Sequence, residues 1–288
     1  MLKKTLAVLG RLSGLSGKSM KAKCTAVFLR LAVTYLLLLL GLTMMQREML
    51  YHPTHDMKPP KAYQLSMDEV HFRAEDSTLL TAWYHPPREG QKVIVYFHGN
   101  ALHLGARHKK FRTYMNGGFG LLALSYRGFG TSEGTPTEKG LYEDARAAVH
   151  YVISSGVPEK DIVLYGESLG TGVATQMATE FPHVAALVLE APYTSVVNRA
   201  QELFFYIPVS LVLQDRFDSI DKMPNVKVPV LFFHGEADAV IPIEHGKALY
   251  AVCTAPKEAK YFPGIHHTDF PWQQLAADMQ TFLKKYDR

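Results

Sequence analysis

The sequence predicts an α/β protein with a mostly parallel central sheet flanked by helices. Short apolar runs, each long enough for one buried strand, alternate along the chain with longer segments of helical pattern. This alternation is typical of strands that are connected through helices on both faces of a sheet. After the first fifty residues about 240 remain, which suits a single domain with a full core. No internal repeat and no low-complexity tract interrupts the pattern.

The expected elements follow one another in a regular order. An opening antiparallel pair is expected at 70–72 and 79–84, joined across 75–77. Further strands are expected at 92–97, 120–125, 161–165, 184–190, 228–233 and 258–262. Helices are expected near 105–116 and at 139–155, 169–180, 244–252 and 271–285. The insertion at 193–227 is short, and we expect it to form a small cap.

The middle of this insertion, 203–213, is strongly apolar. Two interpretations stay open at this point. The segment packs against the domain, or it forms an acyl-chain wall or a patch that touches a membrane.

The most informative motif is Gly-x-Ser-x-Gly at 166–170. It follows the expected strand that ends at 165 and precedes an expected helix, which is the context of a nucleophile elbow. Glycines two residues before and after the serine let strand and helix approach closely at the turn. We therefore expect Ser168 to be a catalytic nucleophile.

A serine hydroxyl is a poor nucleophile, so we expect a base and a group that orients this base. After such an elbow the acid precedes the histidine in the chain. Asp238, in the loop after strand 228–233, is the chosen acid, and Glu236 and Glu190 are weaker candidates. The alternative is that Asp238 only caps the next helix.

The expected base is one of two neighbouring histidines, His266 and His267. Neutral histidine is a suitable base near pH 7, but spacing alone does not choose between these two. A metal site on the two histidines and Asp269 is disfavoured, because adjacent histidines do not converge easily on one ion.

An oxyanion hole completes the expected site. The loop 98–101 follows strand 92–97, and backbone N–H groups there and just after the nucleophile can stabilise a developing oxyanion. We expect the amides of Asn100 and Leu169 to take this role.

Five motifs together resemble the α/β-hydrolase superfamily, and within it the membrane-anchored Bem-type branch, which includes protein depalmitoylase-like serine hydrolases. They lie at 98–100, 126–134, 166–170, 234–238 and 264–269, and the resemblance covers roughly residues 45–288. The closing family pattern Gly-x-x-His-x-Asp falls on Gly264, His267 and Asp269, so the resemblance implies His267 as the base. The chain departs from the family at Ser125, where Asp is usual, and at His266, where Gly is frequent.

The amino-terminal end predicts a membrane anchor. Residues 1–24 carry six basic side chains and no acidic one, and residues 25–45 are apolar except for Arg30. Twenty-one helical residues span about 31 Å, enough to cross a hydrocarbon core. The basic flank 1–24 is expected to stay cytoplasmic, which places the domain at 46–288 on the other side, in a periplasm, a lumen or outside the cell. A cleaved signal peptide and an amphipathic surface helix are the alternatives.

Composition limits the partners. The net charge of +4 owes much to the amino-terminal segment, so we expect no nucleic-acid partner. The two cysteines do not indicate a disulfide framework. We expect a serine hydrolase that cleaves small or lipid-like esters or thioesters through an acyl-enzyme, without cofactor or metal. The alternatives are a serine peptidase on the same triad and a catalytically silent, membrane-anchored binding module.

Overall fold

The computed structural model describes residues 19–287. The chain divides into two compact units, of which the first ends at Gln46 and the second begins at Arg47. Most of the expected basic tail at 1–24 therefore lies outside the described residues.

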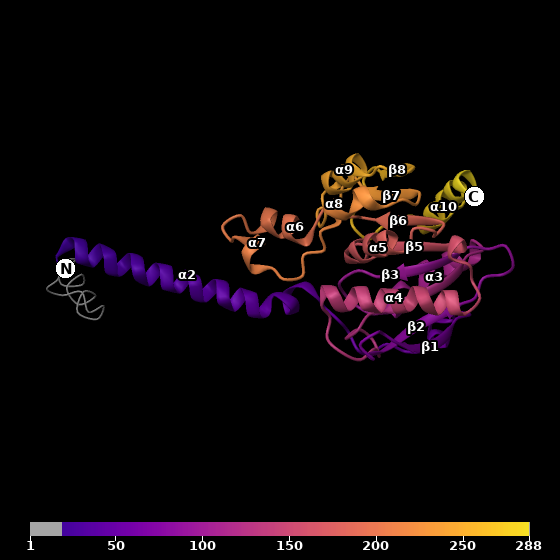
Figure 1. Ribbon diagram of the computed structural model, residues 1–288, viewed down its shortest axis with the longest axis horizontal. Helices are drawn as coiled ribbons and strands as arrows, with labels where there is room; N and C mark the ends of the chain where they lie inside the picture. Colours follow the sequence, from indigo (N-terminus) through magenta and orange to yellow (C-terminus); the bar gives the residue numbers. More distant parts are fainter. Residues whose placement is uncertain (1–18, 288) are drawn as a thin grey trace. The chain divides into compact units, whose positions relative to one another are not determined.

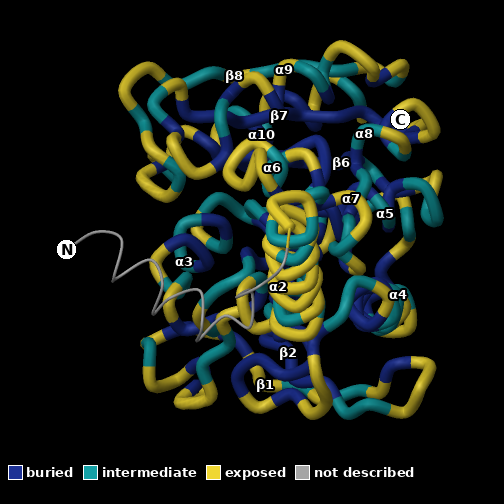
Figure 2. Tube along the Cα trace, turned by 90° about the vertical axis from the view of Figure 1, so that its left-hand side faces the viewer, coloured by how far each residue is buried: buried dark blue, intermediate teal, exposed yellow. Residues whose placement is uncertain are grey.

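The first unit consists of helix α2, Met20–Leu50, whose last turn belongs to the second unit. Among the described residues, α2 is the one helix that is long and apolar enough to cross a membrane. Its side chains are mostly exposed, including Phe28, Leu31 and Leu36 (Figure 2). The helix contains the expected span at 25–45. A membrane anchor and a signal sequence both have this length and composition.

The second unit is built on one sheet, which is formed by eight strands of the described chain in the order β1-β2-β4-β3-β5-β6-β7-β8 (Figure 1). The strands are β1 Asp68–Arg73, β2 Leu79–His85, β3 Val93–Phe97, β4 Gly120–Ser125, β5 Ile162–Glu167, β6 Ala186–Glu190, β7 Val230–Gly235 and β8 Lys257–Phe262. Strand β2 pairs antiparallel with both β1 and β4, and all the other pairs are parallel. The predicted fold class is confirmed.

Two hydrophobic cores cover the two faces of the sheet. Along β3, Val93, Val95 and Phe97 belong to one core and Ile94 and Tyr96 to the other, because successive side chains of a strand point to opposite faces. Helices α4 (Glu138–Ser154), α5 (Leu169–Glu180) and α9 (Ile243–Val252) cover the first face, whereas α3 (His108–Asn116) and α10 (Trp272–Tyr286) cover the second. Strand β7, next to the edge strand β8, is buried throughout (Figure 2).

The observed bounds differ from the predicted ones by a few residues, for identifiable reasons. The helix expected near 105–116 begins with a 3₁₀ turn, Leu104–Arg107, at which His103 Nδ1 accepts a hydrogen bond from Gly105 N–H. The strand expected at 228–233 begins at Val230 instead, since Pro229 has no N–H to donate to a neighbouring strand.

The insertion at 193–227 contains three short helices, α6 (Val196–Leu203), α7 (Val209–Val212) and α8 (Ser219–Lys222). Its apolar middle is divided between two environments. Ile207 and Val209 are buried, whereas Phe205 and Leu211 are exposed. Packing against the domain therefore accounts for only part of this segment.

Candidate active site

Ser168 lies on a strained turn between β5 and α5. Its φ of 50° and ψ of −118° are unusual for a residue with a side chain. A Cβ atom on Gly166 would collide with Gly170 O, and one on Gly170 would collide with Phe97 O. Both neighbouring positions of the motif therefore require glycine, as a nucleophile elbow does. Ser168 N–H donates to Glu190 O at 2.9 Å, which joins the turn to the end of β6.

The structure brings Ser168, His267 and Asp238 into one hydrogen-bonded chain. His267 Nε2 lies 2.9 Å from Ser168 Oγ, and His267 Nδ1 lies 2.7 Å from Asp238 Oδ2. A carboxylate only accepts hydrogen bonds, so Nδ1 carries the proton and Nε2 is free to accept from the serine hydroxyl. The three side chains come from the loops after β5, β7 and β8, at the carboxyl edge of the sheet. This is the geometry that a serine nucleophile with its base requires.

Asp238 is buried, and both of its carboxylate oxygens accept hydrogen bonds. Its Oδ1 accepts from the amides of Val240 and Ile241 at 2.9 and 2.8 Å, while Oδ2 contacts His267. Burial raises the pKa of this carboxyl, but the hydrogen bonds from His267 and Ile241 outweigh it, so the net pKa lies below the usual value. Asp238 therefore stays ionised beside the imidazole. It closes its own loop as well, although it does not cap α9, which begins after Pro242.

The other candidate acids and the second histidine lie elsewhere. His266 is exposed, and its Nδ1 donates to Ala237 O at 2.9 Å. Glu236 is exposed, and Glu190 is buried in a separate ion cluster. Within residues 19–287, none of these three side chains forms a hydrogen bond or an ion pair with His267.

The two amides expected to form the oxyanion hole, those of Asn100 and Leu169, donate no hydrogen bond within the described chain. Leu169 is the first residue of α5, where amides have no partner inside the helix. The adjoining Gly99 lies against Ser168, since a Cβ built on Gly99 would be 3.4 Å from Ser168 Cβ. Asn100 itself is held by its side chain, whose Nδ2 donates to Leu50 O at 2.8 Å.

A buried ion cluster lies directly beside Ser168, and it was not predicted from the sequence. Glu167, which precedes Ser168, pairs with Arg107 at 2.8 Å and with Lys110, and Lys110 also pairs with Glu190 at 2.9 Å. Tyr96 and Tyr165 donate to Glu167 and Glu190, respectively. Burial would raise the pKa of Glu167, but the charges of Arg107 and Lys110 hold it well below its usual range.

Arg107 connects this cluster to the loop after β3, which carries Asn100. Its Nη1 donates to Ala101 O at 3.2 Å and to His103 O at 3.3 Å, while Nε donates to Glu167 Oε1 at 2.9 Å. The guanidinium therefore fixes the loop after β3 relative to the turn that carries Ser168. The sequence shows a basic pair three residues apart in the helix predicted near 105–116 and an acidic residue inside the elbow motif, but it does not show that they pair.

Replacing Lys110 with methionine is expected to destabilise the fold by about 3–5 kcal/mol, because Glu167 and Glu190 would lose a shared buried cation. Chemical denaturation of the purified chain measures this change. Lys139→Met is the matched control, since Lys139 is exposed and pairs with Glu143 at 3.6 Å; it is expected to cost less than about 0.5 kcal/mol. Equal effects of the two substitutions would contradict a role for the cluster in stability.

The motif at 126–134 supports the fold around the end of β4, where Tyr126 and Phe129 pack against His98. Arg127 is buried and donates to Asp144 Oδ1 from Nε and to Asp76 Oδ2 from Nη1, both at 2.8 Å. Ser125, which stands where the family usually has Asp, donates from its hydroxyl to Phe129 O at 2.9 Å.

His98, which precedes Gly99 and Asn100, is fully buried. Its burial and the charge of Arg107 lower the pKa of the imidazole to about 3. His98 is therefore a neutral imidazole across the physiological range.

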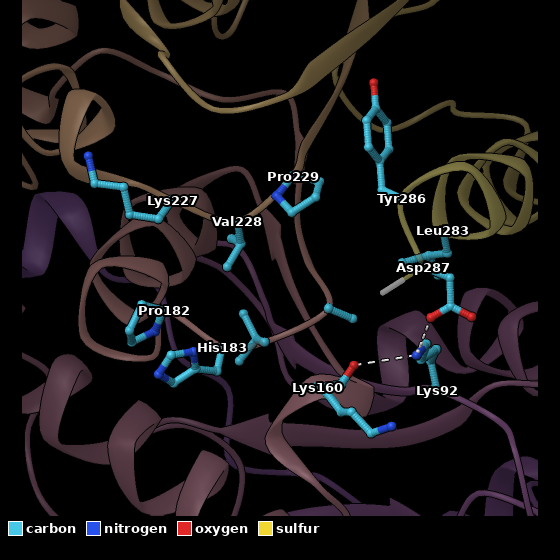
Figure 3. A pocket seen from close by; sticks show the side chains of 12 residues that line it. Lys92, Lys160, Pro182, His183, Lys227, Val228, Pro229, Leu283, Tyr286 and Asp287 are labelled. Carbon is cyan, nitrogen blue, oxygen red and sulfur yellow. Dashed lines mark hydrogen bonds and ion pairs between the residues drawn. The ribbon is translucent and has the colours of Figure 1, made fainter.

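A cavity of about 270 Å³ lies at the opposite edge of the sheet (Figure 3). Its lining includes Lys92, Lys160 and Pro229, which precede β3, β5 and β7, so it is remote from the loops that carry Ser168 and His267. Lys92 Nζ donates there to Asp287 Oδ1 at 2.8 Å and to Lys160 O at 3.4 Å. We assign no part of the candidate site to this cavity.

The described part of the chain offers neither a metal centre nor a disulfide. Residues 19–287 contain no group of three or more His, Cys, Asp or Glu side chains that could hold a metal ion. Cys24 is exposed and Cys253 is buried, and both are free thiols.

Comparison with known proteins agrees with this architecture. The family model described as serine aminopeptidase S33 matches residues 88–217. An uncharacterized protein of Mycobacterium tuberculosis is 32% identical over 228 residues, which cover 78% of this chain and 81% of that protein. The protein bem46 of Schizosaccharomyces pombe is 29% identical over 256 residues, covering 83% and 85% of the two chains.

The fold is also found among solved structures. An esterase of Pyrococcus furiosus superposes with a TM-score of 0.67 over 83% of this chain and 99% of its own, at 19% sequence identity. At that identity the likeness concerns the fold. Together with the relatives in sequence, it shows that the chain belongs to the α/β-hydrolase family, in the branch that includes bem46.

Proposed function

We propose that the protein is a membrane-anchored serine hydrolase that cleaves carboxylic esters or thioesters. The observation that carries this proposal is the hydrogen-bonded chain from Ser168 Oγ through His267 to the buried, ionised Asp238. The strained turn at Ser168 and the two free amides of Asn100 and Leu169 support it. Family membership makes hydrolysis the expected type of reaction.

The proposed reaction has two halves. Ser168 Oγ attacks the carbonyl carbon and passes its proton to His267 Nε2, while Asp238 stabilises the imidazolium and the amides of Asn100 and Leu169 stabilise the oxyanion. The tetrahedral intermediate expels an alcohol or thiol, which takes the proton from His267 and leaves an acyl-enzyme. Water then attacks the acyl carbon while it gives a proton to His267. The bond from the acyl carbon to Ser168 Oγ breaks, the acid leaves, and the proton returns from His267 to Ser168.

The domain organisation belongs to the same proposal. Residues 25–45 would span the membrane, with the basic residues 1–24 on the cytoplasmic side and the catalytic domain at 46–288 on the other side. Residues 193–227 would form the cap. The length and composition of α2 and the excess of positive charge before it support this topology.

Peptide cleavage is a second candidate function, because the matching family model is described as a serine aminopeptidase. The same triad serves both reactions. Ester cleavage is preferred, since the chain has only a small insertion with which to select peptides and its fold matches that of an esterase. Parallel assays of nitrophenyl esters, acyl thioesters and aminoacyl naphthylamides distinguish the two.

Reaction of the full-length, detergent-solubilised protein with a fluorophosphonate probe tests the proposal. We expect one adduct, located on Ser168 by mass spectrometry and lost in His267→Ala, because only an activated serine reacts readily with this probe. Absence of labelling in well-folded protein would contradict an activated serine. That result would favour the alternative of a catalytically silent binding module.

A further inference from the structure

The cap carries a group of large apolar side chains that face solvent. We call it the cap apolar patch; its members are Leu203, Phe204, Phe205, Tyr206 and Leu211. Phe205 is 83% exposed and Leu211 is 85% exposed, which is extreme for such side chains. Scattered single apolar residues on a surface are ordinary, but four of these five are consecutive in the chain, and the rings of Phe205 and Tyr206 lie 5.4 Å apart. A group of this kind marks a surface that binds something.

Local hydrogen bonds hold the backbone beneath the patch. Leu203 ends α6, Leu211 lies in α7, and the chain between them is fixed by local hydrogen bonds. Val209 N–H donates to Gln201 Oε1 at 3.2 Å, and Ile207 N–H donates to Phe204 O at 2.9 Å. Ile207 and Val209 fill the inward positions and are buried. Phe205 and Leu211 therefore point outward as a consequence of folding, and the domain itself leaves them uncovered.

A short stretch of chain and two hydrogen bonds link the patch to Arg47, the residue at which the second unit begins. Leu211 precedes Asp215 by four residues, at most about 14 Å of chain. Asp215 accepts hydrogen bonds from Arg47 Nε at 3.0 Å and from Tyr51 Oη at 3.1 Å, all within the unit that begins at Arg47. Arg47 lies only two residues beyond the proposed span at 25–45, about 3 Å along a helix.

We propose that the cap apolar patch inserts into the interface of the lipid bilayer that α2 anchors, so that the cap meets acyl chains where they leave the membrane. This inference rests on the proposed anchor and hydrolase function. Phe, Tyr and Leu are the side chains expected at the boundary between acyl chains and headgroups. Five side chains are far fewer than the roughly 20–30 residues that each partner contributes to a stable protein interface, which favours lipid over a second protein.

Fluorescence quenching in bilayers tests the insertion directly. Phe205→Trp in the full-length protein adds one tryptophan to the native Trp83 and Trp272, and the wild-type protein gives the background. In phosphatidylcholine bilayers with brominated acyl chains, we expect the added emission to be quenched relative to unbrominated lipid. Unquenched emission would overturn the proposal. Self-association of the wild-type protein, lost in Phe205→Asp, would then identify a second copy as the occupant.

Activity provides an independent measurement. The double substitution Phe205→Asp with Leu211→Asp is expected to lower turnover of a long-chain acyl ester embedded in the bilayer by about tenfold or more. Hydrolysis of a short, soluble ester should be unchanged. Phe205→Trp with Leu211→Met is the matched control, because it keeps the patch apolar, and it should retain both activities. An equal loss on both substrates, or no loss on either, would overturn the proposal.

The two proposals can fail separately. If the wild-type protein hydrolyses neither substrate, the proposed function is wrong, and the quenching measurement still decides whether the patch enters the bilayer. If both substrates are hydrolysed and the emission added by Phe205→Trp remains unquenched, the patch proposal alone is wrong.

Discussion

Replacing Ser168 with alanine is expected to lower ester hydrolysis by about 10⁴-fold or more, to the level that binding and the oxyanion amides sustain alone. In the proposed mechanism, the substitution removes the single atom that attacks the carbonyl carbon. It keeps the Cβ atom and the backbone strain of the elbow, with its φ of 50°, so the midpoint of thermal unfolding should change little. Steady-state turnover of a nitrophenyl ester and a thermal unfolding curve measure the two effects.

Leu169→Met is a suitable control for this experiment, because it retains the backbone amide at the same position and conserves side-chain volume. It should keep most of the activity. Turnover retained by Ser168→Ala would remove Ser168 from the role of nucleophile, whatever the labelling result.

Replacing His267 with alanine is expected to lower turnover by about 10⁴-fold, whereas His266→Ala should lower it by less than about tenfold. His267 joins Ser168 to Asp238, but His266 only donates to Ala237 O from an exposed position. The two neighbouring residues are thus matched controls for each other. Turnover of the same ester measures the difference, and unfolding curves show whether both variants are folded. A larger loss in His266→Ala than in His267→Ala would assign the base to His266.

The sheet and the elbow could be predicted from the sequence because each depends on local patterns. Strand β5 and helix α5 appear as consecutive apolar and helical segments, and the glycines of the motif show where they meet. The choice between His266 and His267 could not be made from spacing, since neighbouring side chains differ only in direction. That direction is set by the loop after β8, in which Gly264 adopts a φ of 70° and Ile265 O accepts from Ala237 N–H.

The ion cluster beside Ser168 was not predictable for a different reason. Glu167 is 60 residues from Arg107 in sequence, and Glu190 is 80 residues from Lys110. Only the order of β3, β5 and β6 in the sheet, with α3 packed over one face, brings these charges together. A charged residue in a buried strand end is visible in the sequence, but the identity of its partner depends on tertiary topology.

The end of α2 and the residues directly after it also hold the loop that carries Asn100. Leu50 O accepts from Asn100 Nδ2, His52 N–H donates to Asn100 O at 2.8 Å, and Leu102 N–H donates to His52 O at 3.1 Å. A soluble enzyme engineered from this chain therefore has to begin before Leu50, since a later start would free the loop that carries Asn100. In the proposed membrane-anchored enzyme, the chain that leaves the anchor would therefore also hold the loop that carries Asn100 in position.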